Sequence, residues 1–223
     1  NYKNARCFNQ DVIASLDKPF NTATALAVLQ GNICENGAVI KPSAASPNLF
    51  KHTGKAVVFE NIEDFKARID DPDLPVDETS VLVLKNVGPK GYPGMPEVGN
   101  MNLPVKLIEK GVKDMLRISD GRMSGTGFGT VVLHVSPEAT LGGNFSVLET
   151  GDIITLDLEA RSLNVDLSDA ELNARKEKWI KPKNLVDRGY TGLYINNVEQ
   201  AHLGADFHFL KGGSGSEVTR DSH

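Results

Sequence analysis

Cysteine is scarce in this chain of 223 residues, which holds only Cys7 and Cys34. Two thiols cannot form a disulfide framework, and they cannot supply the four ligands of a zinc or iron–sulfur cluster. Apolar runs are short as well, and none approaches the roughly 20 residues that span a bilayer. No apolar leader follows the N-terminus, which lacks an initiator Met. We therefore expect a cytoplasmic chain (or one of the mitochondrial matrix, if eukaryotic) that is a piece of a longer protein.

An excess of positive charge is also lacking. Lys and Arg number 24 against 29 Asp and Glu, so the formal net charge is −5. Phosphate-rich surfaces repel such a chain, which argues against nucleic acid and membranes as partners. Hydrophobic residues make up 40% and charged residues 24%, as in ordinary globular proteins. A chain of this length predicts one large domain, or one domain with an appendage.

The common phosphate-loop, dinucleotide-binding, zinc-protease and hydrolase-elbow motifs are missing too. Glycine, in contrast, is unevenly distributed: 12 of the 21 glycines lie between Gly88 and Gly151. Most of them fall in two loops, over residues 88–100 and 120–129. Because glycine costs backbone entropy on folding, two such loops need a reason. Close approach of the backbone to a ligand is one such reason.

The pattern around these loops is mostly that of β-strands. Short segments rich in Val, Ile and Leu predict strands over residues 38–41, 55–59, 80–84, 115–118 and 130–135, and a hairpin over 152–158 and 162–167. Helices are predicted over 61–69 with an Asn cap, from residue 103 onward, and over 172–179 after a Ser168–Glu171 capping box, with Pro182 ending the last. The apolar pattern of the opening stretch, up to Leu29, predicts another short helix. Residues 30–168 therefore form a β-rich core, followed by a helical segment and a Gly/Ser-rich tail.

Two side chains in the glycine-rich loops are candidates for chemistry. Ser124 follows a predicted strand, so its oxygen could enter a cavity while neighbouring N–H groups face an anion. The alternative is a turn serine that binds its own backbone. Glu97 is the only carboxylate between Glu78 and Glu109. It could ligate a hard cation such as Mg²⁺, or it could be a solvated loop acid.

The remaining candidates have plainer interpretations. His134 lies in a predicted strand, as a core or face residue, and His202 and His208 are expected at surface or packing positions. His223 is the last residue, where a side chain is usually disordered. Cys34 is expected to be a buried or loop thiol.

Three stretches carry a resemblance to a known family: Gly31-Asn-Ile-Cys-Glu-Asn-Gly-Ala-Val-Ile-Lys-Pro-Ser-Ala44, Lys85-Asn-Val-Gly-Pro-Lys-Gly-Tyr-Pro-Gly-Met-Pro-Glu97 and Ile118-Ser-Asp-Gly-Arg-Met-Ser-Gly-Thr126. They resemble the dehydratases of dihydroxy acids and sugar acids (the IlvD/Edd family), and only the C-terminal portion of that family. The resemblance implies a mixed α/β, β-rich fold. It places a swivelling β-barrel-like catalytic domain over 30–168, with short helices. Residues 1–29 would be a linker or helical segment from a missing N-terminal domain, and 169–223 a helical segment and tail.

The resemblance also implies a chemistry. Family members remove water from a 2,3-dihydroxy acid and form an enol that becomes the 2-keto acid. Ser124 matches the proposed alkoxide base for the C2 proton, Glu97 matches an Mg²⁺ ligand, and Thr126 and Gly125 match positions beside the substrate. The pKa of such a serine must fall far below its free value, which neighbouring cations and loop N–H groups would help achieve. A [2Fe-2S] cluster is implied, with ligands outside this chain, so the isolated chain should be inactive and hold no iron.

Details of the motifs favour the sugar-acid branch (arabinonate, xylonate, galactonate). The amino-acid branch usually has Gly-Gly-Pro-Gly-Met-Arg-Glu-Met where this chain has Gly91-Tyr-Pro-Gly-Met-Pro-Glu-Val98. The ending resembles that of the sugar-acid branch, where the terminal His, here His223, reaches the substrate. We expect a hydro-lyase that converts an aldonate to its 2-keto-3-deoxy acid, as a homo-oligomer (dimer or tetramer). The alternatives are a dihydroxy-acid dehydratase of branched-chain amino-acid synthesis and a non-catalytic small-molecule-binding module.

Overall fold

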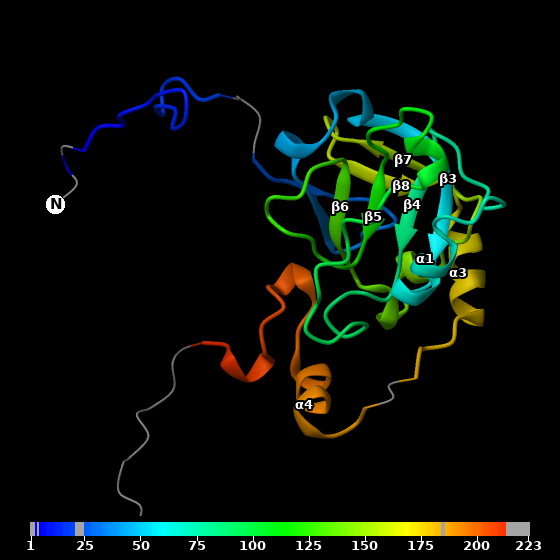
Figure 1. Cartoon of the computed structure of the whole chain (residues 1–223). Coiled ribbons are helices and arrows are strands. Elements are labelled where there is room, and N and C mark those ends of the chain that lie inside the picture. The colour runs from blue at the N-terminus through cyan, green and yellow to red at the C-terminus, as the bar shows by residue number, and fades with distance from the viewer. Residues whose placement is uncertain (1–2, 4, 21–24, 184–185, 213–223) are drawn as a thin grey trace, which may run out of the picture.

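The computed structural model describes residues 3, 5–20, 25–183 and 186–212 (Figure 1). Its centre is one mixed sheet of eight strands in the order β1-β2-β6-β5-β4-β3-β7-β8. The strands are β1 (Ala27–Leu29), β2 (Gly37–Ile40), β3 (Lys51–Phe59), β4 (Val81–Leu84), β5 (Arg117–Ser119), β6 (Val131–Ser136), β7 (Ile153–Asp157) and β8 (Ser162–Val165).

The sheet curls until its two edge strands nearly meet. The four strands β3, β4, β5 and β6 run parallel, and the pairs β1–β2, β2–β6, β3–β7 and β7–β8 are antiparallel. Gln30, directly after β1, forms a bridge with Ser162 at the start of β8, and Leu163 N donates to Gln30 O at 2.9 Å. This bridge joins the first and last strands, so the β-rich, barrel-like α/β fold is confirmed.

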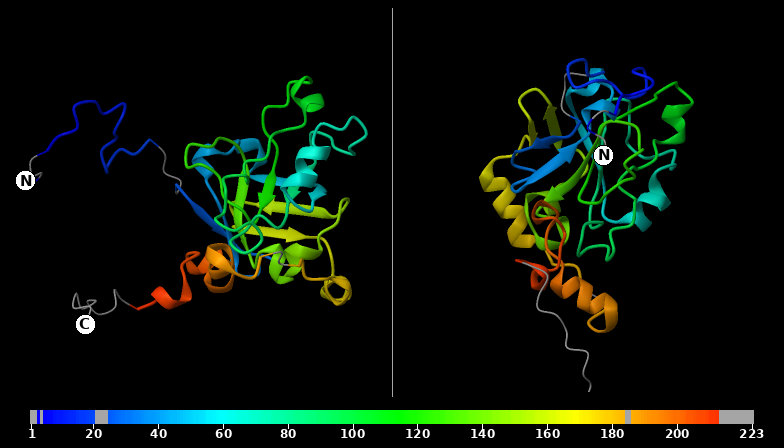
Figure 2. Two further views of the ribbon diagram at one scale, coloured as in Figure 1. Left: turned by 60° about the horizontal axis from the view of Figure 1, so that its bottom comes forward. Right: turned by 90° about the vertical axis from the view of Figure 1, so that its left-hand side faces the viewer.

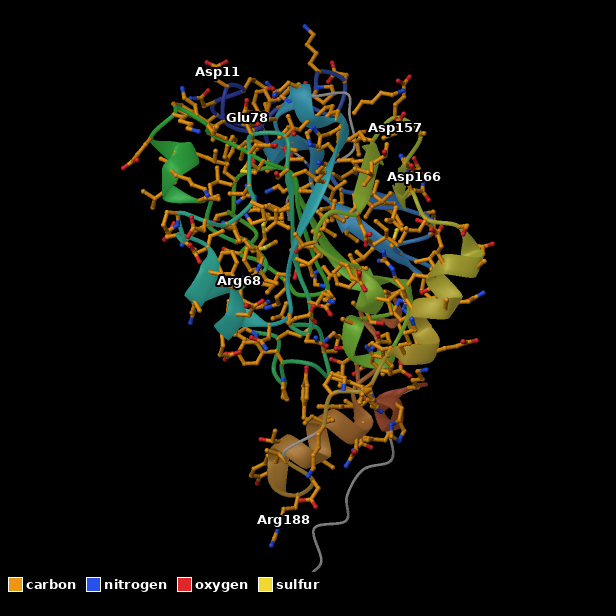
Figure 3. All side chains as sticks on the ribbon, turned by 90° about the vertical axis from the view of Figure 1, so that its right-hand side faces the viewer. Asp11, Arg68, Glu78, Asp157, Asp166 and Arg188 are labelled. Carbon is orange, nitrogen blue, oxygen red and sulfur yellow. The ribbon has the colours of Figure 1, made fainter. Side chains whose placement is uncertain are left out.

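Strand β4 is buried on both faces, as expected for a parallel strand in the middle of a sheet. Val81 and Val83 belong to the apolar cluster inside the barrel, whereas Leu82 and Leu84 belong to a second cluster outside it. The second cluster is covered by two short helices, α1 (Ile62–Arg68) and α2 (Val105–Ile108). Arg68, labelled in Figure 3, lies over the Phe59 ring with 5.1 Å between guanidinium carbon and centroid.

The helix caps predicted from the sequence are confirmed. The Asn61 side chain accepts from Asp64 N at 2.8 Å, and the capping box of Ser168 and Glu171 makes both of its bonds. Helix α3 (Asp169–Lys178), which this box opens, ends before the predicted Trp179, whose ψ of 133° is already extended. The helix therefore stops short of Pro182. Beyond it lie α4 (Gly189–Asn197) and the 3₁₀ turns η5 (Ala201–Leu203) and η6 (His208–Leu210), beside the barrel in Figure 2.

The predicted helix of the opening stretch is wrong. Residues Ala27–Leu29 form β1, which pairs antiparallel with β2. Ala27 and Leu29 are buried whereas Val28 is 51% exposed, so burial repeats every two residues and follows the period of a strand. Gly31 follows shortly after the strand, with a φ of 155°. Any larger residue would clash at this position, because a Cβ there would lie 1.9 Å from Leu163 O. A strand of three residues is too short for its sequence to distinguish the two-residue period of a strand from the 3.6-residue period of a helix.

Candidate active site

The two glycine-rich loops leave the sheet at the same edge. The first, residues 88–100, follows β4, and the second, residues 120–129, follows β5 directly (Figure 1). Because β4 and β5 are parallel neighbours, their carboxyl ends lie side by side. This is the edge at which open parallel sheets of α/β proteins usually bind ligands.

Two buried carboxylates fix the start of both loops. Asp120, fully buried, accepts hydrogen bonds from Asn86 N (3.1 Å), Val87 N (3.0 Å) and Ala139 N (2.9 Å). Glu138, equally buried, accepts from the backbone N–H groups of residues 90 and 91. Asp120, the first residue of the second loop, therefore binds the two residues that precede the first loop, Asn86 and Val87. The sequence analysis identified neither Asp120 nor Glu138 as a site residue.

The same two acids influence each other electrostatically. Burial, together with the negative charge of Glu138, raises the pKa of Asp120 to about 7, although its three N–H donors oppose the rise. The pKa of Asp120 is thus brought close to neutral pH. A single acid between a buried strand and a glycine was the sequence signal that could have identified it.

A buried ion pair fixes the far ends of the loops. Arg117 Nη2 lies 2.9 Å from Asp114 Oδ1, and the two side chains are 7% and 5% exposed. Arg117 also donates to Asn100 Oδ1 (3.1 Å) and Met101 O (2.9 Å), which end the first loop. Asp114 accepts from the N–H and hydroxyl of Thr130, which ends the second. Both loops are thus held at both ends by buried charged groups.

A third contact joins the loops between those ends. Arg122 Nη2 lies 3.0 Å from Glu97 Oε1, and Arg122 Nε donates to Met95 O at 2.8 Å. Gly99 N in turn donates to Arg122 O at 2.8 Å. Glu97 is therefore a paired loop acid, held beside the residue that precedes Ser124 by two positions. The sequence reasoning did not single out Arg122.

Ser124 makes the contacts of a turn serine and is also one of the residues that line a cavity. Its Oγ lies 3.0 Å from Thr126 Oγ1 and 3.5 Å from Thr126 N, and its carbonyl accepts from Gly127 N at 2.9 Å, as in a serine turn. The same side chain also lines a cavity of about 320 Å³. Gly125 has open space where a Cβ would lie, so nothing crowds the backbone next to Ser124.

The Ser124 cavity is mostly apolar. The residues that line it are Leu26, Val39, Lys41, Met123, Ser124, Gly125, Val131, Leu133 and His134. Lys41 donates from Nζ to Gly125 O at 2.8 Å. Half-buried His134 has its pKa lowered by burial first and by the charge of Arg122 second, so its imidazole is neutral near pH 7. An apolar cavity with a few convergent polar groups is the usual form of a small-molecule site.

His202 and His208 are exposed and each makes one polar contact, as predicted for surface or packing positions. His202 Nδ1 lies 3.1 Å from Ser136 Oγ, and His208 Nδ1 lies 3.3 Å from Asn197 O. His223 lies outside the described residues. Cys34 is fully buried, and burial raises its thiol pKa to about 12. Without a bound metal ion, this thiol therefore stays protonated at neutral pH.

The donor set for metals in this chain is small. Among the residues that the structure describes, no group of three His, Cys, Asp or Glu side chains is arranged to hold a metal ion. The half-exposed carboxylate of Glu97 would supply one oxygen ligand of an Mg²⁺ ion. The chain holds two cysteines, the half-buried Cys7 and the buried Cys34, which are too few to form an iron–sulfur cluster site by themselves.

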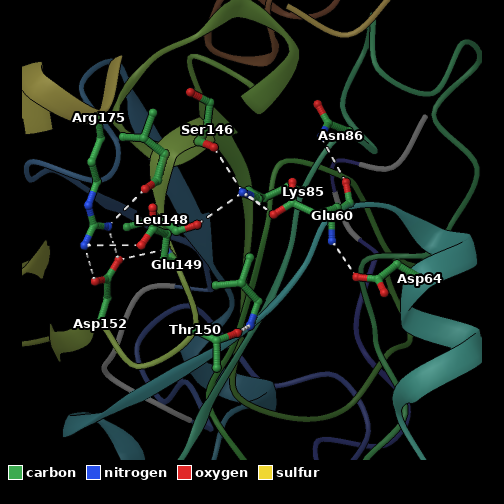
Figure 4. Close-up of polar contacts among 12 residues, drawn as sticks. Glu60, Asp64, Lys85, Asn86, Ser146, Leu148, Glu149, Thr150, Asp152 and Arg175 are labelled. Carbon is green, nitrogen blue, oxygen red and sulfur yellow. Dashed lines mark hydrogen bonds and ion pairs between the residues drawn. The ribbon is translucent and has the colours of Figure 1, made fainter. Parts of the chain in front are cut away.

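A second group of charged side chains, shown in Figure 4, is structural. The buried Lys85 ammonium lies 2.7 Å from Glu60 Oε1 and donates to Ser146 O (3.0 Å) and Leu148 O (3.2 Å). Each of its three protons has an acceptor, so the group has no donor left for a ligand. It joins the end of β4 to the turn η4 (Asn144–Val147).

None of the described helices is long and apolar enough to span a membrane.

The family model for dihydroxy-acid/6-phosphogluconate dehydratase C-terminal domains matches residues 11–205. L-arabinonate dehydratase of Rhizobium leguminosarum bv. trifolii (strain WSM2304) is 53% identical over 97% of this chain and 37% of its own length. The 6-deoxy-6-sulfo-D-gluconate dehydratase of Pseudomonas putida is 48% identical over 94% of the chain and 37% of its own length. A dihydroxy-acid dehydratase of Archaeoglobus fulgidus is 43% identical over 88% of this chain and 35% of its own length. The chain thus spans little more than a third of these relatives.

Proposed function

Because this chain belongs to the dihydroxy-acid/6-phosphogluconate dehydratase family, whose C-terminal domain it forms, we propose that it supplies the base of a sugar-acid dehydratase. The observation that carries the proposal is the pairing of Arg122 with Glu97, which brings the Glu97 loop against the Ser124 loop beside a cavity. Relatives named for L-arabinonate and for sulfogluconate support an aldonate as the substrate class. The product would be the 2-keto-3-deoxy acid.

The proposed reaction is a β-elimination of water. Ser124, as an alkoxide, removes the proton from C2 of the aldonate, and the electron pair of that C–H bond forms the C2–C3 double bond. The C3–O bond breaks, and the departing hydroxide takes up the proton that Ser124 accepted, so that it leaves as water and the alkoxide is restored. The resulting enol loses its hydroxyl proton and gains one at C3, which gives the 2-keto acid without net oxidation or reduction.

The residues around Ser124 suit this role. Thr126 places a hydroxyl and an N–H beside Ser124 Oγ, where both can donate to an alkoxide. The walls of the cavity are mostly apolar, and an apolar surrounding strengthens these interactions. Gly125 leaves room for a substrate next to the serine. His223, if it reaches the substrate as the resemblance implies, would add a further contact.

Two cofactors are part of the proposal. Mg²⁺, held in part by Glu97, would supply Lewis-acid chemistry at the substrate carboxylate and 2-hydroxyl. We assign a [2Fe-2S] cluster to the remainder of the protein, since the two cysteines of this chain are too few to form the cluster site. That remainder, the N-terminal part, is the required partner of this chain. Assembly into a dimer or tetramer is also proposed.

The test is the release of 2-keto acid by the full-length protein that contains this chain. Pentonates, hexonates and 2,3-dihydroxyisovalerate are offered separately with Mg²⁺. Turnover of an aldonate supports the proposal. Turnover of dihydroxyisovalerate alone assigns the protein to branched-chain amino-acid synthesis. No turnover of any of them, with the cluster intact, supports a binding module instead.

A further inference from the structure

One peptide group of the second loop links Lys41 to Ser124. Its carbonyl, from Gly125, accepts a hydrogen bond from Lys41 Nζ at 2.8 Å. Its N–H, from Thr126, lies 3.5 Å from Ser124 Oγ. Because a peptide group is planar and rigid, a bond that fixes the carbonyl also fixes the direction of the N–H. Lys41 and the Ser124 hydroxyl are therefore connected through a single rigid unit.

We propose that Lys41 is a positioning residue for Ser124: it orients the Gly125–Thr126 peptide towards the serine oxygen and places a positive charge in the same cavity. This inference rests on the proposed function and extends it. A hydrogen bond to a carbonyl polarises the peptide and makes the N–H on its other side a stronger donor. Both effects favour the alkoxide over the hydroxyl, because a nearby cation and an N–H donor stabilise negative charge on oxygen.

The position of Lys41 follows from the fold. Lys41 comes directly after β2, which pairs antiparallel with β6 in the register Ile40–Val132. The end of β2 therefore lies beside the start of β6, where the second loop ends. Gly129 N also donates to Ala44 O at 2.9 Å, so two bonds attach this loop to the segment after β2.

The titratable groups around the serine lie on three elements. Lys41 is at the end of β2 and the neutral His134 is on β6, and both line the cavity, whereas Arg122 lies outside it on the loop itself. Arg122 is paired with Glu97, so its charge is partly compensated. Lys41 binds a neutral carbonyl, so this contact leaves its charge uncompensated. Lys41 is therefore the group whose removal should most change the charge felt at the serine oxygen.

The test compares Lys41→Met and Lys41→Arg in the full-length protein with a matched control, Lys106→Met. Lys106 is also a half-buried lysine that donates to backbone carbonyls, Leu74 O (2.7 Å) and Pro72 O (2.8 Å), but it lies outside the cavity. The readouts are kcat, KM, the pH profile of kcat, the unfolding midpoint and the cluster absorbance. The substrate is an aldonate that the wild-type protein turns over.

We expect Lys41→Met to lower kcat about tenfold or more, with little change in KM. The limb of the pH profile that reports the base should move to higher pH by about one unit. Lys41→Arg should restore part of kcat and return the limb towards its wild-type position. Lys106→Met should match the wild type in kcat and in the position of this limb. Wild-type kcat in Lys41→Met, or a loss of kcat with an unmoved limb, overturns the proposal. If Lys41→Met does not fold, a Lys41→Arg variant with a wild-type unfolding midpoint but no restored kcat overturns it as well.

A parallel Ser124→Ala variant separates this inference from the proposed function. If Ser124→Ala is inactive and Lys41→Met behaves as the wild type, only the role of Lys41 is rejected. If Ser124→Ala turns over the substrate normally, serine is not the base, and the proposed function and the role of Lys41 are rejected together.

Discussion

The guanidinium of Arg122 lies 3.0 Å from the carboxylate of Glu97, and this pair joins the two glycine-rich loops of the protein. Both side chains are about half exposed, so the pair contributes at most about 1 kcal/mol to stability. Its effect is on orientation, because it holds Glu97 against the loop that carries Ser124. A half-exposed carboxylate with a weakly bound cationic partner can also exchange that partner for a metal ion.

Replacing Glu97 by Gln should raise the Mg²⁺ concentration that the full-length protein needs for half-maximal turnover. The substitution keeps the shape of the side chain and removes the charge that a hard cation prefers. A Mg²⁺ titration of turnover measures the effect, and Glu109→Gln, an exposed acid beyond α2, is the control. A titration curve that matches the wild type would return Glu97 to the role of a loop acid without a metal.

Gly129→Ala should destabilise the chain by more than about 2 kcal/mol. Gly129 has a φ of 121°, and a Cβ there would lie 1.8 Å from Arg117 Nη2 and 2.9 Å from Asp114 Oδ1. The new methyl group would disrupt the buried ion pair that ends both loops. Gly125→Ala, in the same loop but with open space around the new atom, should unfold at nearly the wild-type urea concentration. Equal midpoints for the two variants would contradict this account of the anchor.

Asp120 should make the stability of the chain depend on pH. Its folded pKa, about 7, lies above the value of 3.8 expected when unfolded. Stability from this group is therefore fully present below pH 3.8 and is lost as the pH rises to about 7, with a slope of about 1.4 kcal/mol per pH unit. The difference in unfolding free energy between the wild type and Asp120→Asn should fall over this window and then level off. A difference that stays constant from pH 4 to pH 8 would show that the carboxyl ionises normally.

Much of the fold could be predicted from the sequence because it depends on local chemistry. The Asn61 cap and the Ser168–Glu171 box involve residues three apart, and both are present. The composition of residues 80–84 predicts a strand, and the observed strand Val81–Leu84 is buried throughout. The first strand was mistaken for a helix because Ala27–Leu29 is too short for its period to be visible.

The contacts that build the site could not be predicted, since they join distant parts of the chain. Lys41 and Gly125 are 84 positions apart, and Asp120 binds Val87, 33 positions earlier. No local pattern connects such pairs; only the order of strands in the sheet brings them together. The motifs indicated that Ser124 and Glu97 matter, whereas the groups that hold them in place became visible only in three dimensions.

The most direct test of the central claim is the rate of 2-keto-acid formation from an aldonate by Ser124→Ala in the full-length protein. Ser43→Ala, an exposed serine in the turn η1 (Pro42–Ala44), serves as the control. Both variants should keep the wild-type unfolding midpoint and cluster absorbance. We predict that Ser43→Ala turns over as the wild type does and that Ser124→Ala forms no measurable product. Near-normal turnover by Ser124→Ala would contradict the assignment of this serine as the base.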